Sequence, residues 1–363
     1  MKSLAIVIAC FCWTTAALAA SPPKVVNAAD GIFTAFQTHP LVGLGEWHGL
    51  AQEEDFYAVL VRDPRFAKEV GNIVLESGVA THQALVDRYV NGENVPYREL
   101  RKVWSDGVVG VGVAGMGAAN LYAAIRAVNQ SLPPESRIKV WLGEPPIDWS
   151  QIKVRADWVP FQQGRDSHLM TVLEQEILSK GRKALVIYGA AHFGVYPGGF
   201  FPQPSPFLQP NVRFRLDSSH PGALYFVLPY VGNMTAECMN DFERNLHDQQ
   251  APAFLSPVRG STLEEIVKRA DCMPLPKPSE LTPEQWEAQM QMNNGATANA
   301  FLYLGPRKSL LTSPGLPDLY LDLEFRAEID RRVRLRFGSG LPAPDPASNP
   351  VTAQPYEKLL TQN

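Results

Sequence analysis

Apolar, β-branched runs alternate with amphipathic stretches along the first half of the chain. The apolar runs cover residues 41–46, 72–77, 137–144 and 183–192. Apolar positions at helical spacing fill much of the sequence between them, at residues 53–70, 80–92 and 165–181. Strands that alternate with helices through short connections are typical of parallel sheets with crossover helices. The pattern therefore predicts an α/β fold with a mostly parallel sheet.

The second half of the chain predicts additions to that sheet. Residues 212–217 and 223–229 are short apolar runs close together, which predicts an antiparallel pair of strands at the sheet edge. A further strand and two C-terminal helices are predicted at 300–306, 279–291 and 322–336. We expect a single domain over residues 21–337, with a C-terminal extension from about residue 230. Residues 338–363 are rich in proline and small polar residues, which predicts a disordered tail.

The N-terminus predicts export to the periplasm or the medium. Residues 1–20 combine a basic Lys2, an apolar stretch and a small-x-small cleavage pattern, as secretory signal peptides do. A lipoprotein cut before Cys10 is the alternative, but it would leave a very short apolar run. The remaining cysteines, Cys238 and Cys272, suggest one disulfide in an oxidising compartment, with two unpaired thiols as the alternative.

Composition and known motifs exclude several functions. The formal net charge is −4 and no basic stripe appears, which argues against a nucleic-acid partner. No segment after the signal peptide is apolar enough to span a membrane. The chain has no Gly-x-Ser-x-Gly elbow, no phosphate-binding loop and no His-Glu-x-x-His helix. A small-molecule or peptide ligand remains, and the pattern does not fix an oligomeric state.

Carboxylates and imidazoles collect where the predicted strands end. These positions are Glu46, His48, Glu76, Glu144 and His192. Because ligands bind beyond the carboxyl ends of parallel strands, we expect these side chains to converge at one edge of the sheet. The predicted helix before the fourth strand starts with Arg165 and Asp166. A Glu-x-His pair at a helix start, or a single loop histidine, can be explained by local structure alone. Because such residues occur at four predicted strand ends, they indicate a functional site.

Two chemistries suit this convergence. His48, Glu76 and His192 form a ligand set for a divalent transition metal, with Mn, Co, Zn or Fe as candidates. The same groups without a metal could perform acid–base chemistry on water.

The segments "LGEWHG", "VLESGVATHQALVDRYVNG" and "RDSHLMTVLEQEILSKGRKALVIYGAAHFG" resemble a known superfamily. It groups the ChaN-type haem-binding lipoproteins, the erythromycin esterases and the TraB/Tiki metal-dependent proteins, and the ChaN-like branch is the most similar. The resemblance covers roughly residues 41–194. It implies an α/β fold and a site made of Glu46, His48, Glu76, Arg165 and His192. The esterase branch has an extra residue between Glu and His, which this chain lacks.

Two functional hypotheses follow. In the first, the protein is a hydrolase in which His48 or Glu46 activates a water, either directly or on a metal bound by His48, Glu76 and His192. Arg165 would stabilise the oxyanion, and residues 193–210 would form a lid or a substrate wall. In the second, the protein binds haem or an iron complex for uptake. An apolar slot would then be lined by Trp47, Phe193, Phe200 and Phe201, with tyrosines 89, 188 and 196 as candidate axial ligands. A degenerate site on a purely structural domain is a third reading.

Overall fold

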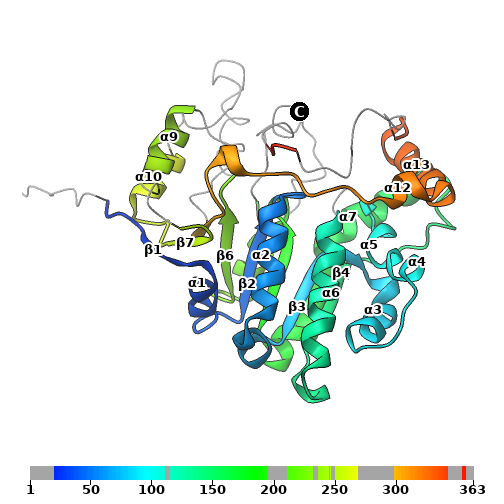
Figure 1. The fold of residues 1–363 in the computed structure, drawn as a ribbon, viewed down its shortest axis with the longest axis horizontal. Coiled ribbons are helices and arrows are strands. Elements are labelled where there is room, and N and C mark those ends of the chain that lie inside the picture. The colour runs from blue at the N-terminus through cyan, green and yellow to red at the C-terminus, as the bar shows by residue number, and fades with distance from the viewer. Residues whose placement is uncertain are drawn as a thin grey trace, which may run out of the picture.

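A computed structural model of the chain describes residues 20–110, 115–194, 211–231, 236–244, 246, 250–268, 298–341 and 354–356. Within these ranges eight strands form one sheet in the order β1-β7-β8-β6-β2-β5-β3-β4. The strands are β1 (Lys24–Asn27), β2 (Leu41–Glu46), β3 (Asn72–Val79), β4 (Lys139–Glu144), β5 (Ala184–Gly189), β6 (Leu224–Pro229), β7 (Ala253–Ser256) and β8 (Ala300–Tyr303). The predicted α/β fold with a mostly parallel sheet is confirmed (Figure 1).

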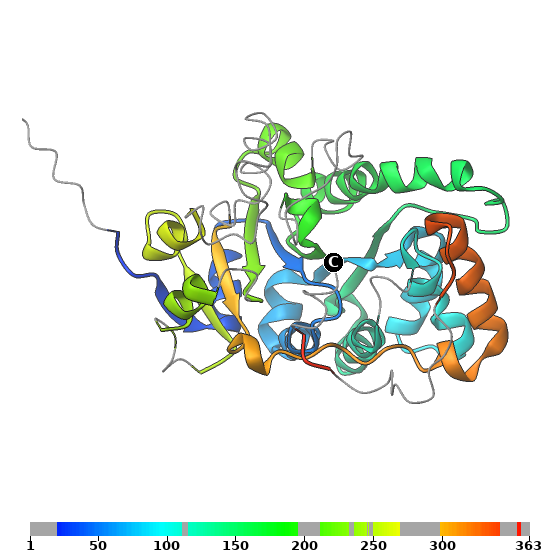
Figure 2. The same cartoon turned by 90° about the horizontal axis from the view of Figure 1, so that it is seen from above.

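Helices cover both faces of the sheet (Figure 2). Those that pack on it or precede it are α1 (Ala28–Ala35), α2 (Ala51–Arg62), α3 (Gln83–Val90), α6 (Met116–Gln130), α7 (Arg155–Val172) and α8 (Val212–Ser219). Shorter or peripheral ones are α4 (Tyr97–Leu100), α5 (Lys102–Ser105), α9 (Ala236–Arg244), α10 (Thr262–Lys268), α12 (Asp318–Leu321) and α13 (Leu323–Phe337). In Figure 2, α2 and α6 lie on one side of the sheet and α7 on the other.

The apolar runs become strands because the sheet buries them on both faces. Every residue of β2 and β5 is buried, as expected for strands that lie between parallel neighbours and under helices. Six strands, from β8 to β4 in the sheet order, are parallel. Antiparallel edge strands exist as predicted, but they are β1 and β7.

The predicted antiparallel pair at 212–217 and 223–229 is wrong. Residues 212–217 belong to helix α8, whose first turn is capped because Asn211 accepts a hydrogen bond from the Phe214 N–H at 3.0 Å. Val212 and Leu216, four residues apart, turn the same buried face to the core. The run at 223–229 does form a strand, β6, but it pairs parallel to β2.

The C-terminal segment crosses the top of the domain. After β8 it runs past the starts of α2 and α6 to α12 and α13 (Figure 1). Ser313 N–H donates to the Gly49 carbonyl at 2.7 Å, and Ala51 N–H to the Leu311 carbonyl at 2.9 Å. Tyr356 is buried and its N–H donates to the Leu310 carbonyl at 2.9 Å, so the expected disorder is wrong for residues 354–356.

Several expectations fall outside the described residues. They concern the signal peptide, the lid over 195–210, the helix at 279–291 and Cys272. Cys238 lies fully buried on α9. Its pairing with Cys272 stays a prediction, because Cys272 is outside the described residues. Among the described residues, no helix combines the length and apolar character needed to cross a bilayer.

Candidate functional site

Four adjacent strands deliver acidic or imidazole side chains to one edge of the sheet. The register places Glu46 at the end of β2 opposite Gly189 at the end of β5, and Glu144 at the end of β4 opposite Val79 of β3. Glu76 lies on β3 beside them, where the pairing of β3 with β4 is irregular between Leu75 and Val79. An irregularity of this kind re-aims a side chain from its ladder position. The structure thus brings the strand-end residues together.

Glu76 is the centre of the group. Its side chain is buried, and its Oε1 accepts a hydrogen bond from Arg165 Nη2. The same oxygen lies 3.7 Å from His48 Nε2 and 3.5 Å from His192 Nε2. Its Oε2 accepts a hydrogen bond from the Gly189 N–H. Although burial raises the pKa of Glu76, the cationic His48, Arg165 and His192 outweigh burial and hold it well below its ordinary value.

The glycine of the Gly-x-x-His sequence makes this approach sterically feasible. A Cβ on Gly189 would lie 2.8 Å from His48 Nε2 and 3.2 Å from Glu76 Oε2. The first distance is shorter than a non-bonded contact allows, so any side chain would push the imidazole away. Gly189 is followed by a short 3-10 turn, Ala190–Phe193, which carries His192 back over the end of β5.

Arg165 links two buried carboxylates. It lies in the middle of α7, which starts at Arg155, so the expected helix start at Arg165 is wrong. Besides Glu76, it binds Glu144, whose Oε1 accepts from Arg165 Nε at 2.6 Å. Burial raises the pKa of Glu144 even beside Arg165. Two donors of Arg165 are thus committed to carboxylates, which makes it a positioning residue and does not match the predicted oxyanion role.

His192 is held from its other side by Asp166, also on α7. The Asp166 Oδ1 accepts a hydrogen bond from His192 Nδ1, which directs Nε2 toward Glu76. Burial and Arg165 lower the pKa of His192, whereas Glu76 and Asp166 raise it, with a net rise to about 8. A carboxylate that fixes the tautomer and orientation of an imidazole is a common device at catalytic and metal-binding histidines.

His48 lies between two carboxylates. Its Nδ1 is 3.5 Å from Glu46 Oε1, and among the described residues this buried nitrogen has no hydrogen-bond partner. Burial lowers the pKa of His48, but Glu76 and Glu46 more than offset this and raise it to about 9. Candidate ligand atoms of Glu46, His48 and Glu76 all lie within 4.8 Å of one another. The three could hold a metal ion; the predicted set had His192 in place of Glu46.

Two buried acids on α2, Glu53 and Glu54, lie near Glu46 and were not predicted from the sequence. Glu53 accepts from the Trp47 N–H at 3.0 Å and from the Tyr57 hydroxyl. Burial and the charge of Glu46 raise the pKa of Glu53 well above its ordinary value, and burial raises that of Glu54 to about 7. The signal was the acidic pair in the first turn of α2, separated from "GEWHG" by three residues. An N-terminal turn usually exposes such residues, so burial could not be read from the pattern.

The aromatic residues assigned to a haem slot are engaged in the core. Trp47 is buried and its Nε1–H donates to the Pro229 carbonyl at 2.9 Å. Phe193 is buried and stacks on Phe226 with ring centroids 4.9 Å apart. Tyr188 is also buried. The predicted slot is therefore wrong for Trp47 and Phe193, and Phe200, Phe201 and Tyr196 lie outside the described residues.

Comparisons with known proteins find weak similarity only. No family model matches the chain, and no curated protein matches it. Among solved structures, the type III effector HopBA1 is 12% identical with a TM-score of 0.36, covering 59% of this chain and 87% of that one. A structure described as cofacial haem binding to ChaN of Campylobacter jejuni is 14% identical with a TM-score of 0.36, covering 58% and 88%. We therefore base the functional proposal on the geometry of the site.

Proposed function

We propose that this protein is an exported hydrolase that cleaves an ester or amide bond with a water activated at the Glu46, His48 and Glu76 cluster. The observation that carries the proposal is the convergence of these three ligand atoms within 4.8 Å, beside an imidazole that a carboxylate orients. Such a set, brought together by three adjacent strands, favours bond cleavage over simple packing, since burying several ionisable groups costs free energy and such groups concentrate at functional sites.

The donor set fits a divalent cation. Two carboxylates and one imidazole are ligands that Mn, Fe, Co and Zn accept. The buried Nδ1 of His48 has no hydrogen-bond partner among the described residues, so in its deprotonated form it is available as a metal ligand. Although burial lowers the pKa of His48, Glu76 and Glu46 raise it to about 9, and a cation bound between the same groups would replace the proton on His48. A bound divalent ion would supply Lewis acidity toward a substrate carbonyl.

The chain's own residues would position and move protons. Arg165 and the Gly189 N–H hold the Glu76 carboxylate in place. Asp166 fixes His192 so that its Nε2 faces the cluster, where it can accept a proton from water and return it to the leaving group. Within the described residues, Arg165 is committed to two carboxylates, so we assign it the positioning of Glu76 and Glu144 and no contact with the substrate.

The test is turnover of an ester and peptide panel by the full chain loaded with each candidate metal. His192→Gln should lower kcat by about 10²- to 10⁴-fold, the usual contribution of a general acid–base group. Asp166→Asn should lower kcat with a smaller change in KM, because it disturbs the orientation of His192 and not a substrate contact. His168→Gln, a partly buried histidine on the same helix, serves as the matched control. Absence of turnover on every substrate and metal, or equal losses in the control, would contradict the proposal.

A further inference from the structure

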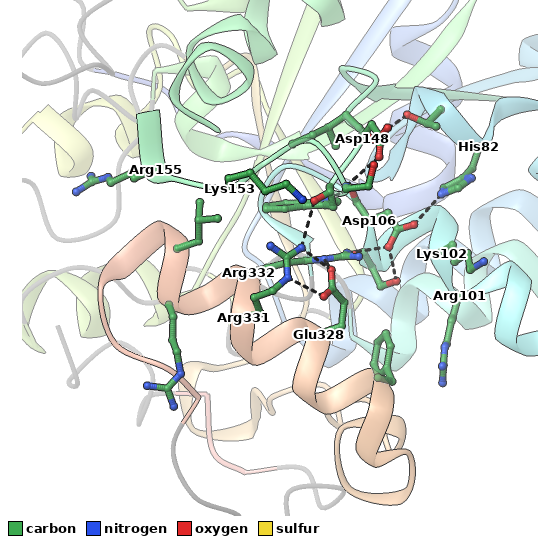
Figure 3. A pocket seen from close by; sticks show the side chains of 18 of the residues that line it. His82, Arg101, Lys102, Asp106, Asp148, Lys153, Arg155, Glu328, Arg331 and Arg332 are labelled. Atoms are coloured by element: carbon green, nitrogen blue, oxygen red, sulfur yellow. Dashed lines mark hydrogen bonds and ion pairs between the residues drawn. The ribbon is translucent and has the colours of Figure 1, made fainter. Parts of the chain in front are cut away.

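A cavity lies beyond β4, apart from the candidate site. It has a volume of about 1220 Å³ and lies between the loop after β4, the α4–α5 region and helix α13 (Figure 3). None of Glu46, His48, Glu76, Arg165 or His192 is among the described residues that line it. The segment next to it connects the two regions, because Asp106 lines the cavity and the Val108 N–H donates to Glu144 Oε2 at 3.2 Å.

The lining of this cavity is strongly basic. Eight lysine and arginine side chains line it against three carboxylates, and three of the arginines pair with aspartates just outside the lining, Asp318, Asp322 and Asp330. The whole chain carries a formal net charge of −4, so the cavity gathers positive charge on a protein that is acidic overall. A hollow lined by charge of one sign concentrates ligands of the opposite sign.

Part of this charge is fixed by internal pairing. Arg332 is largely buried and binds Asp106 at 2.8 Å and Glu328 at 2.7 Å, while Arg331 binds Glu328 at 2.8 Å. Arg332 also lies over the Trp149 ring, 5.0 Å from its centroid. These contacts hold two guanidinium groups of α13 in defined positions on one wall, as Figure 3 shows. Because their donors are largely committed to Glu328, Asp106 and backbone carbonyls, these two arginines shape the wall, and the cations open to a ligand must come from elsewhere in the lining.

Three further arginines of the lining are also paired, Arg98 and Arg101 with Asp322 and Arg334 with Asp330, whereas two lysines in the described part of the chain are not. Lys102 on α5 and Lys153 on the loop after β4 are exposed, and within the described ranges neither ammonium group forms a hydrogen bond or an ion pair within 4.0 Å. They approach the cavity from different elements, and α13 supplies the wall below them in Figure 3. Several separate cationic walls suit a ligand with more than one anionic group. Trp149, Phe325 and Leu335 add apolar lining for an organic body.

We propose that this cavity binds a small organic polyanion that carries two or more phosphate or carboxylate groups, at a site separate from the hydrolytic cluster. Arginine forks match either anion, so the two sources share one recognition chemistry. The proposal does not depend on hydrolysis, since none of the cluster residues contacts the cavity.

The test is calorimetric titration of the full chain with inorganic triphosphate and, separately, with citrate. Because both anions chelate divalent cations, the protein is first freed of metal and His48→Ala is titrated in parallel. We expect saturable binding at one site per chain, kept in His48→Ala. The Lys102→Glu/Lys153→Glu variant should weaken binding by about tenfold or more, as loss of charge complementarity does. The preferred anion distinguishes phosphate from carboxylate ligands.

Lys68→Glu is the matched control, because Lys68 is exposed and lies outside the cavity. It should bind as the wild type does. Thermal unfolding of each variant verifies that the fold is intact. Failure of both anions to saturate the wild type would overturn the proposal. So would wild-type affinity in the double variant, equal weakening in Lys68→Glu, or loss of binding in His48→Ala, which would place the anion at the hydrolytic cluster.

Discussion

The cluster proposed to be hydrolytic and the basic cavity differ in how their charged side chains are balanced. In the cluster, Glu76, Glu144 and Arg165 are buried and their charges are held by one another. In the cavity, Lys102 and Lys153 are exposed to solvent and the excess charge is left open. Buried charges must be paired to be tolerated, whereas solvated charges can stay available for a ligand. The charges of the cluster are therefore balanced by one another, whereas the exposed cations of the cavity remain available to a ligand.

The largest predicted difference concerns the stability of the two regions when an arginine is removed. Arg165→Leu should lower the free energy of unfolding by about 3–5 kcal/mol, because it leaves Glu76 and Glu144 buried without their partner. Arg331→Leu in the cavity should cost about 0–1 kcal/mol, because its side chain is 42% exposed and its ion pair is solvated. Urea unfolding of both variants measures this. Equal losses would remove the distinction between the regions.

Glu54, on the helix beside the cluster, and Asp106, in the cavity, should give stability contributions that respond to pH with opposite signs. Burial raises the pKa of Glu54, behind the cluster, from 4.5 to about 7. The folded protein therefore binds this proton more tightly than the unfolded chain, and stability falls as pH rises from about 4.5 to about 7. The fall should be about 2–3 kcal/mol, and Glu54→Gln should remove it.

Asp106 in the cavity has the opposite behaviour. Burial alone would raise its pKa, but His82 and Arg332 outweigh burial and lower it below its ordinary value of 3.8. Its contribution to stability is therefore present above pH 3.8 and lost as pH falls further. Unfolding curves of Asp106→Asn and Glu54→Gln across this pH range measure both effects. A wild-type slope that survives in Glu54→Gln would contradict the assignment to the buried acid.

A smaller effect is expected from a methyl group at the end of β5. Gly189→Ala should cost about 1–3 kcal/mol, because the new Cβ lies 2.8 Å from His48 Nε2 and must displace the imidazole. Gly164→Ala on α7 is the matched control, since nothing lies within 4 Å of a Cβ there. It should stabilise the helix by about 0.5–1 kcal/mol. Thermal unfolding compares the two, and metal binding should weaken only in Gly189→Ala.

Much of the fold could be predicted because its strands are buried on both faces. Runs such as 41–46 and 183–192 need no tertiary information, since two-sided burial requires near-continuous apolar residues. The run at 212–217 misled because its alternation resembles a strand, while the deciding feature was the cap at Asn211. Pro160 and Gly164, which disfavour helix, concealed that α7 begins at Arg155.

The cluster could be predicted from the sequence and the cavity could not, because only the cluster residues lie at the ends of predictable strands. Parallel strands bring their carboxyl ends together, so Glu46 and His192 could be placed near each other from topology alone. The cavity draws its cations from segments far apart in sequence, around residues 98–102, 153–155 and 331–334. The one strongly basic run, "RRVRLR" at 331–336, shows only the α13 wall and not the residues that face it, and the net charge points the other way.

The most direct test of the central claim is the metal content of the purified full chain, measured together with its visible absorption spectrum. Wild type, His48→Ala and His192→Ala are compared. The account predicts near-stoichiometric Mn, Co, Zn or Fe without a Soret band, lost in His48→Ala and retained in His192→Ala, because His48 and not His192 belongs to the ligand cluster. A Soret band on haem addition with no tightly held metal would contradict the account and favour haem binding.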